Sequence, residues 1–171
     1  YYESPQALSR FEDGFMGCKF IVVLRDPLER ALSNYFFSKS NGLERRSIRE
    51  AFSGPLLSHP SNISVNPFDY LGRSRYSKLL LPWINSKLSK DLHFIKYEQL
   101  TKTPELSLSR LFNFIGCDQD TRYLEGITLN TRVNFAAEPT NYMEAQKHIP
   151  SSVLSILVNE RKKMETLFVN S

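Results

Sequence analysis

The sequence has little cysteine and no cluster of metal-binding side chains. Cys18 and Cys117 are the two cysteines among its 171 residues, too few for a scaffold held together by disulfides. Neither has a cysteine or histidine partner at the spacing of a zinc site, so no metal is expected. Both lie among apolar residues, and we expect each to be a small buried side chain.

Long hydrophobic runs and nucleic-acid signals are also lacking. No stretch is long enough to span a bilayer, so no membrane span is expected in this chain. The excess of positive charge is small, 22 Lys+Arg against 18 Asp+Glu. No basic stripe with interleaved aromatic residues accompanies it, and we expect no nucleic-acid partner. The length and the 41% hydrophobic content fit one globular domain over residues 1–171.

Several catalytic signatures are absent. No Gly-x-Ser-x-Gly elbow occurs, which argues against a serine hydrolase. No Gly-x-x-x-x-Gly-Lys loop occurs either, because Gly14 and Gly17 lack the basic and hydroxyl partners of a phosphate cradle. His93 falls in an apolar run and is expected to be a core histidine rather than a base. No catalytic residue can therefore be named from such signatures.

The apolar pattern predicts an α/β fold. Lys19–Arg25 and Leu92–Tyr97 are short apolar runs typical of buried parallel strands, the first apolar on both faces. Strands that alternate with helices indicate a parallel sheet. Two strands are too few for a stable sheet, so we expect further strands from sequence outside this chain. Helices are expected from Pro27 through Tyr35, over Glu44–Phe52, over Ser74–Leu88 with a kink at Pro82, from Thr103 to Gly116, and from Pro150 onward. The buried residues of the last helix are expected to be Val153, Leu154, Leu157, Val158, Met164 and Leu167. Loops are expected over Ser53–Asn66 and Ile127–Met143.

The most informative pattern is Arg-x-Pro-x-x-Arg-x-x-Ser, which begins at Arg25 and ends at Ser33. Average residue usage produces it at about one position in 10⁵. Arg25 follows the first strand, at the edge where open α/β sheets bind ligands. The helix that opens at Pro27 should point its free N–H groups to the same place. A phosphate dianion suits this set, although Arg25 could instead pair with a structural carboxylate and Ser33 with its own helix backbone.

This pattern lies within "FIVVLRDPLERALSNY", residues 20–35, which resembles the 3′-phosphate-binding strand and helix of sulfotransferases that use PAPS (3′-phosphoadenosine 5′-phosphosulfate). The resemblance implies that Arg25 and Ser33 bind the 3′-phosphate. Three further blocks are similar to later parts of that family, in the same order. They are a Tyr-x-x-x-Leu-x-x-Trp helix in residues 70–88, a late strand with a Tyr-Glu-x-Leu turn in residues 92–117, and a loop that closes over the nucleotide in residues 130–139.

The resemblance implies a three-layer α/β fold related to P-loop kinases, a parallel sheet flanked by helices. It implies PAPS as co-substrate, its bisphosphate PAP as product, no metal, and a carbohydrate or small-molecule acceptor with a hydroxyl or amine. Tyr97 would reach the adenine side, or be an ordinary core or surface tyrosine. Arg132 would touch the phosphates from the closing loop, or be a solvated loop arginine. The oligomeric state stays open, as does the compartment: the cytoplasm for a bacterial protein, the Golgi lumen for a truncated eukaryotic one.

The start of the chain departs from the family pattern. Residues 2–5, "YESP", resemble an element that follows the family's glycine-rich sulfate-binding loop, so we expect an N-terminal strand and that loop to be absent from this chain. Glu3 stands where the family often has lysine, and a carboxylate there would repel a sulfonate. Either Glu3 points away or the alignment is shifted by one residue; Glu3 as the catalytic base is a further alternative. Two other functions stay open: a kinase of related topology, and an inactive module that binds sulfated or acidic glycans.

Overall fold

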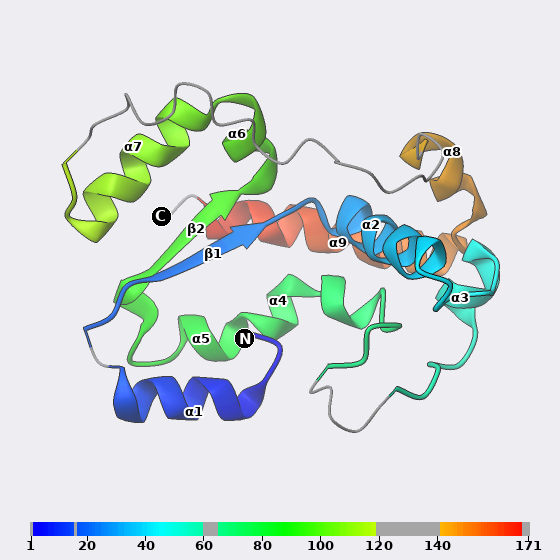
Figure 1. The fold of residues 1–171 in the computed structure, drawn as a ribbon, viewed down its shortest axis with the longest axis horizontal. Coiled ribbons are helices and arrows are strands. Elements are labelled where there is room, and N and C mark those ends of the chain that lie inside the picture. The colour runs from blue at the N-terminus through cyan, green and yellow to red at the C-terminus, as the bar shows by residue number, and fades with distance from the viewer. Residues whose placement is uncertain (1, 16, 60–64, 119–140, 169–171) are drawn as a thin grey trace.

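The computed structural model describes residues 2–15, 17–59, 65–118 and 141–168. Its sheet consists of two parallel strands, β1 (Phe20–Leu24) and β2 (Leu92–Lys96), in a register that pairs Val23 with Ile95. Helices lie on both sides of the strands (Figure 1): α6 (Tyr97–Lys102) and α7 (Pro104–Ile115) on one side, and α1 (Pro5–Gly14), α4 (Tyr76–Leu79) and α5 (Leu81–Ile84) on the other. The predicted parallel sheet between helical layers is confirmed.

The junction between β1 and α2 (Pro27–Ser40) forms as the sequence predicts. Asp26 is the N-cap, and its Oδ1 accepts hydrogen bonds of 3.0 Å from the backbone N–H groups of Leu28 and Glu29. Pro27 occupies the first helical position, where a missing N–H costs nothing. The strand therefore passes directly into a helix whose first turn is fixed by its own cap.

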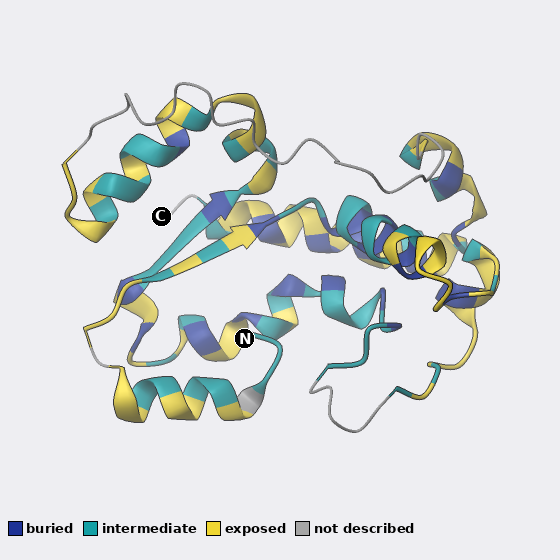
Figure 2. Ribbon diagram, viewed as in Figure 1, coloured by how far each residue is buried: buried dark blue, intermediate teal, exposed yellow. Residues whose placement is uncertain are grey.

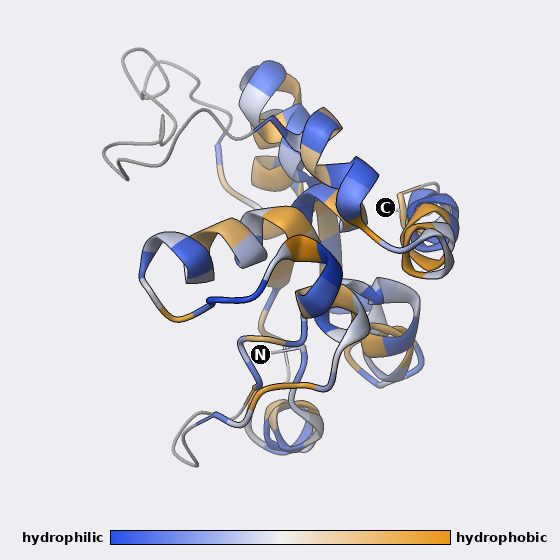
Figure 3. Ribbon diagram, turned by 90° about the vertical axis from the view of Figure 1, so that its right-hand side faces the viewer, coloured by the Kyte–Doolittle hydropathy of each residue, from blue (hydrophilic) through white to orange (hydrophobic). Residues whose placement is uncertain are grey.

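Two apolar clusters form the core. The larger one lies where α2 packs against α9 (Ser151–Leu167), α8 (Tyr142–Ala145) and α3 (Ile48–Ser53). The smaller one lies beneath the sheet and joins Leu24 to Tyr76, Leu80 and Met164. Figure 3 shows hydrophobic and hydrophilic stretches alternating along the helices, as amphipathic packing requires. α2 and β1, which meet at the predicted phosphate motif, are thus each anchored in the core.

β1 is less buried than its sequence predicts. Ile21 and Val23 are 46% and 45% exposed, and Figure 2 shows an exposed stretch on this strand. Ile95, which pairs with Val23 in the register, is only 5% exposed. The difference arises because α6 and α7 pack on β2, where His93 stacks on Phe114 with ring centroids 4.9 Å apart. In the described part of the chain, β1 is covered on one face only.

Several local expectations need correction. The helix expected over residues 74–88 is broken into α4 and α5, because Pro82 cannot continue the hydrogen-bond ladder of α4. α1 and α8 were not predicted, and α8 falls at the end of an expected loop. Cys18 and Cys117 are exposed, since each lies in a turn just outside a strand or helix.

The ends of the later helices agree better with the sequence. α7 stops at Gly116, whose φ of 76° is the left-handed cap that glycine favours. In α9 the expected burial of Val153, Leu157 and Met164 is confirmed, but Val158 is 37% exposed. Glu160 is buried there instead, accepting hydrogen bonds from the backbone N–H and the hydroxyl of Ser77. Three 3₁₀ turns complete the described elements: η1 (Gly72–Ser74), η2 (Ser89–Asp91) and η4 (Gln146–His148).

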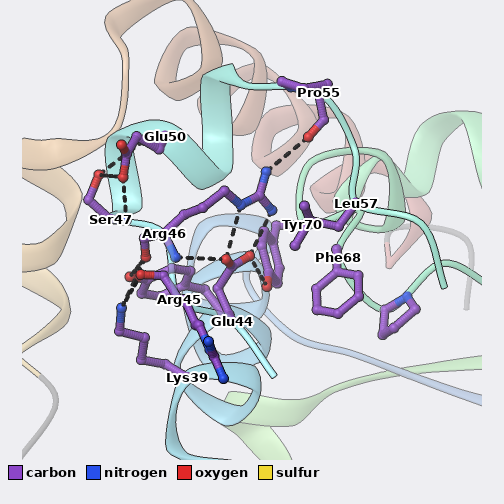
Figure 4. Close-up of polar contacts among 12 residues, drawn as sticks. Lys39, Glu44, Arg45, Arg46, Ser47, Glu50, Pro55, Leu57, Phe68 and Tyr70 are labelled. Carbon is purple, nitrogen blue, oxygen red and sulfur yellow. Dashed lines mark hydrogen bonds and ion pairs between the residues drawn. The ribbon is translucent and has the colours of Figure 1, made fainter. Parts of the chain in front are cut away.

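A buried ion pair fixes the chain that leaves α2 (Figure 4). The side chain of Glu44 is fully buried and accepts from Arg46 Nε at 3.0 Å and Nη2 at 2.7 Å, and from the Tyr70 hydroxyl at 3.0 Å. Arg46 also donates to the carbonyl oxygen of Pro55. Beside it, Ser47 and Glu50 form a capping box that starts α3. These bonds tie the segments on either side of α3 to the C-terminal end of α2.

Candidate functional site

Arg25 and Ser33 lie at one pocket. An open pocket of about 280 Å³ is lined by Arg25, Arg30, Ser33, Asn34 and Phe37, at the point where β1 becomes α2. The capped turn at residue 26 and two turns of α2 bring the first and last residues of the motif together. Another pocket, of about 290 Å³, lies between β2, α6, α7 and the end of α9 and contains no member of the motif. The pocket on α2 is therefore the candidate site.

Arg25 is held firmly at this pocket. Its Nη2 and Nε donate to Glu29 Oε2 over 3.0 and 3.3 Å. Its guanidinium carbon lies over the rings of Tyr97 and Tyr142, 5.2 and 5.4 Å from their centroids. Burial works to lower the pKa of Arg25, but hydrogen bonds and charge interactions with Glu29 and Tyr142 raise it overall. Arg25 is thus a fixed cation, with 20% of its side chain exposed.

Ser33 presents an unengaged hydroxyl. Among the residues that the structure describes, its Oγ has no hydrogen-bond partner, and the side chain is partly exposed at the pocket. The alternative in which Ser33 bonds its own helix backbone is therefore not what the structure contains. A hydroxyl beside Arg25 can donate one hydrogen bond to an anion.

Arg30, the middle arginine of the motif, is paired with Glu3. Its Nη2 lies 3.3 Å from Glu3 Oε1, while Arg73 Nε lies 2.7 Å from Glu3 Oε2. Burial, together with the charge of Arg73, lowers the pKa of Arg30. Both oxygens of Glu3 are thus engaged by arginines and its side chain is 10% exposed, an arrangement that suits charge compensation better than proton abstraction.

The amino end of α2 does not offer free N–H groups, contrary to expectation. Asp26 Oδ1 accepts from Leu28 and Glu29, and the Asp26 carbonyl oxygen accepts from Arg30 over 2.8 Å. Asp26 caps this helix with its own side chain, and a satisfied cap leaves no donors for a ligand. An anion at this site must therefore be bound by side chains.

Two long-range contacts that no sequence pattern indicates hold the turn before α2. The Asp26 backbone N–H donates to Glu98 Oε1 over 2.9 Å, and Asp26 Oδ2 pairs with Arg161 of α9. Arg161 belongs to a basic run that would otherwise be assigned to a solvated helix face. α6 and α9 thus both position the strand-to-helix turn.

The remaining candidates have different outcomes. Tyr97 is 38% exposed and its ring faces the guanidinium of Arg25, so it lies beside the predicted phosphate ligand. Tyr142, which also contacts Arg25, lies in a segment expected to be a loop and carried no recognisable motif. Arg132 and the expected closing loop at residues 130–139 lie outside the described residues.

Comparison with known proteins identifies the family. A profile described as a sulfotransferase domain matches residues 15–166. The chain belongs to the sulfotransferase family. Two heparan sulfate glucosamine 3-O-sulfotransferases of Mus musculus, 3B1 and 3A1, are each 27% identical to it over 121 residues. These alignments cover 68% of this chain but 29% of each mouse enzyme, so the chain spans well under half the length of these relatives.

The fold of this sulfotransferase also matches a solved structure. The crystal structure of a sulfotransferase from Alicyclobacillus acidocaldarius superimposes with a TM-score of 0.69 at 17% identity, covering 98% of this chain and 61% of the bacterial one. The similarity supports the predicted P-loop-kinase-like sulfotransferase fold. Within the described residues, no helix is long and apolar enough to cross a membrane, and no group of His, Cys, Asp and Glu could hold a metal ion.

Proposed function

We propose that this chain binds the 3′-phosphate of PAPS and belongs to an enzyme that transfers the sulfuryl group to a hydroxyl or amine. Arg25 would supply a charge-assisted hydrogen bond to the phosphate and Ser33 a neutral one. Asp26, Glu98 and Arg161 would act indirectly, by holding the turn that positions Arg25. Residues 1–171 would form part of one sulfotransferase domain.

One observation carries the proposal: a single open pocket is lined by both Arg25 and Ser33. Ser33 has no hydrogen-bond partner among the described residues, so its hydroxyl is available without breaking a contact. Arg30 lines the same pocket and adds positive charge near it, although Glu3 compensates part of that charge. Tyr97 lies against Arg25, and we propose that it orients the guanidinium rather than contacting the adenine. Arg132 would be a second ligand of the phosphates.

A carbohydrate hydroxyl is the acceptor class to test first. The mouse relatives are named for transfer to a glucosamine residue of heparan sulfate, and the aligned part spans most of this chain. Phe37 is 53% exposed at the edge of the pocket, and apolar surface of this kind can pack against the faces of sugar rings. Small-molecule alcohols and amines are the next classes to try.

Calorimetry with adenosine 3′,5′-bisphosphate tests the nucleotide site. Arg25→Ala should weaken binding by about 2–3 kcal/mol, the scale of charge-assisted hydrogen bonds, or roughly 30- to 150-fold in Kd. Arg25→Lys should recover only part of this loss, because lysine keeps the charge but not the fork. Ser33→Ala should cost about 1 kcal/mol. Arg110→Ala removes the same charge from an exposed position on α7 and should change little.

The other outcomes separate the alternatives. Tight binding of ATP with no preference for the bisphosphate would favour a kinase-like site and overturn the proposal. Binding of a sulfated glycan without any nucleotide would instead favour a module that has lost catalysis. An Arg25→Ala variant that binds the bisphosphate as the unmodified protein does would show that the phosphate site lies elsewhere.

A further inference from the structure

Glu29 lies between the two residues proposed to bind the phosphate. It follows Arg25 by four positions and precedes Ser33 by four, so Glu29 and Ser33 share a face of α2. Its carboxylate is bound to Arg25 through a single oxygen, Oε2, which accepts from both Nε and Nη2. A negative charge that belongs to the protein itself therefore occupies one edge of the guanidinium.

That edge is one through which arginine binds phosphates and carboxylates most strongly. Two parallel N–H donors on a planar fork match the oxygens of either group. Glu29 thus makes with Arg25 the contact that a bound phosphate would make. Among the described residues, Glu29 is the carboxylate partner of Arg25, while Arg30 pairs with Glu3 and Arg161 with Asp26.

The two partners differ in how freely they can move. The Arg25 side chain is 20% exposed and is packed against the rings of Tyr97 and Tyr142. The Glu29 side chain is 43% exposed, and among the described residues its carboxylate accepts hydrogen bonds from Arg25 alone. When a ligand arrives, Glu29 can turn toward solvent at little cost, because its own side chain lies half in solvent and ion pairs of this kind contribute little. Arg25 would stay in place.

We infer that Glu29 is an internal competitor for Arg25, which the 3′-phosphate of a nucleotide must displace and which limits how tightly that phosphate binds. This inference rests on the proposed function. A phosphate dianion carries more charge than a carboxylate and can take its place, whereas a 3′-hydroxyl leaves the ion pair intact. The same competition weakens the binding of the bisphosphate product and thereby favours its release.

Calorimetry with two ligands tests this role. Glu29→Gln removes the charge but keeps the size of the side chain, and it should tighten binding of adenosine 3′,5′-bisphosphate by about three- to tenfold. Binding of adenosine 5′-monophosphate, which lacks the 3′-phosphate, should not change. Glu105→Gln, at an exposed position on α7, makes the same charge change away from the pocket and should leave both affinities unchanged.

A double-mutant cycle gives the decisive comparison. In the Arg25→Ala background, Glu29→Gln should have no effect on bisphosphate affinity, because the competitor then has nothing to compete for. Weaker or unchanged bisphosphate binding in Glu29→Gln would overturn the inference and make Glu29 a residue that positions Arg25. If the glutamine variant unfolds, the bisphosphate affinity of Glu29→Ala tests the same inference. Failure of the unmodified protein to bind the bisphosphate would instead refute the proposed function, so the two failures are distinguishable.

Discussion

Removal of the charge on Glu44 should destabilise the protein in a pH-dependent way. This carboxylate is fully buried and accepts hydrogen bonds from the guanidinium and backbone N–H of Arg46 and from the hydroxyl of Tyr70. Burial alone would raise the pKa of Glu44, but the bonds from Arg46 and Tyr70 outweigh it and lower the pKa from 4.5 to about 2. Folding is thereby linked to ionisation of this group.

The size of the effect follows from this pKa. Each unit corresponds to about 1.4 kcal/mol, so the ionised form should contribute about 3 kcal/mol at neutral pH. Because the folded-state pKa lies below the unfolded one, this contribution is complete above roughly pH 5 and is lost as the pH falls toward 2. About half of it should remain at pH 3. Glu44→Gln should therefore cost about 3 kcal/mol at pH 7 and clearly less at pH 3.

Urea unfolding of the unmodified protein and of Glu44→Gln at both pH values measures this difference. Glu144→Gln is a matched control, because Glu144 forms an exposed pair with Lys147 and its loss should cost under about 0.5 kcal/mol. A cost below about 1 kcal/mol for Glu44→Gln at pH 7 would refute the reasoning. So would a cost that does not shrink between pH 7 and pH 3.

Two further predictions concern the turn before α2 and the end of α7. Glu98→Ala should weaken bisphosphate binding and lower stability by about 1–2 kcal/mol, because the Asp26 N–H loses its acceptor, whereas Glu98→Gln should retain most of both. Calorimetry and thermal unfolding check this, and equal losses in the two variants would contradict it. Gly116→Ala should cost about 1 kcal/mol, because its φ of 76° is unfavourable for any residue with a Cβ. An unchanged Tm would show that the cap can relax.

Local features were predictable where neighbouring residues decide the structure. The strand that ends at Leu24, the cap at Asp26 and the helix that starts at Pro27 follow from apolar pattern, side-chain capping and the fixed φ of proline. The stop of α7 at Gly116 follows from left-handed backbone preference in the same way. Each of these signals depends on residues only a few positions apart, so the amino-acid sequence alone is enough to predict it.

The sequence was less informative where an element depends on what covers it. The apolar run of β1 predicted burial on both faces, yet Ile21 and Val23 are half exposed because the helices after β2 pack on β2. Pro82 signalled a kink, but whether the helix bends or breaks depends on the packing of α4 and α5. α8 is too short for a periodic signal, so Tyr142 could not be placed beside Arg25 in advance.

The sequence alone determined the candidate pair Arg25 and Ser33, since a strand, a capped turn and two helical turns bring them together. Only the tertiary structure decided what surrounds them. Tyr97 and Tyr142 lie against Arg25. Asp26 is held by Glu98, 72 residues away in the sequence, and by Arg161, 135 residues away. Contacts over such separations are set by the packing of whole helices and strands, which no local pattern encodes.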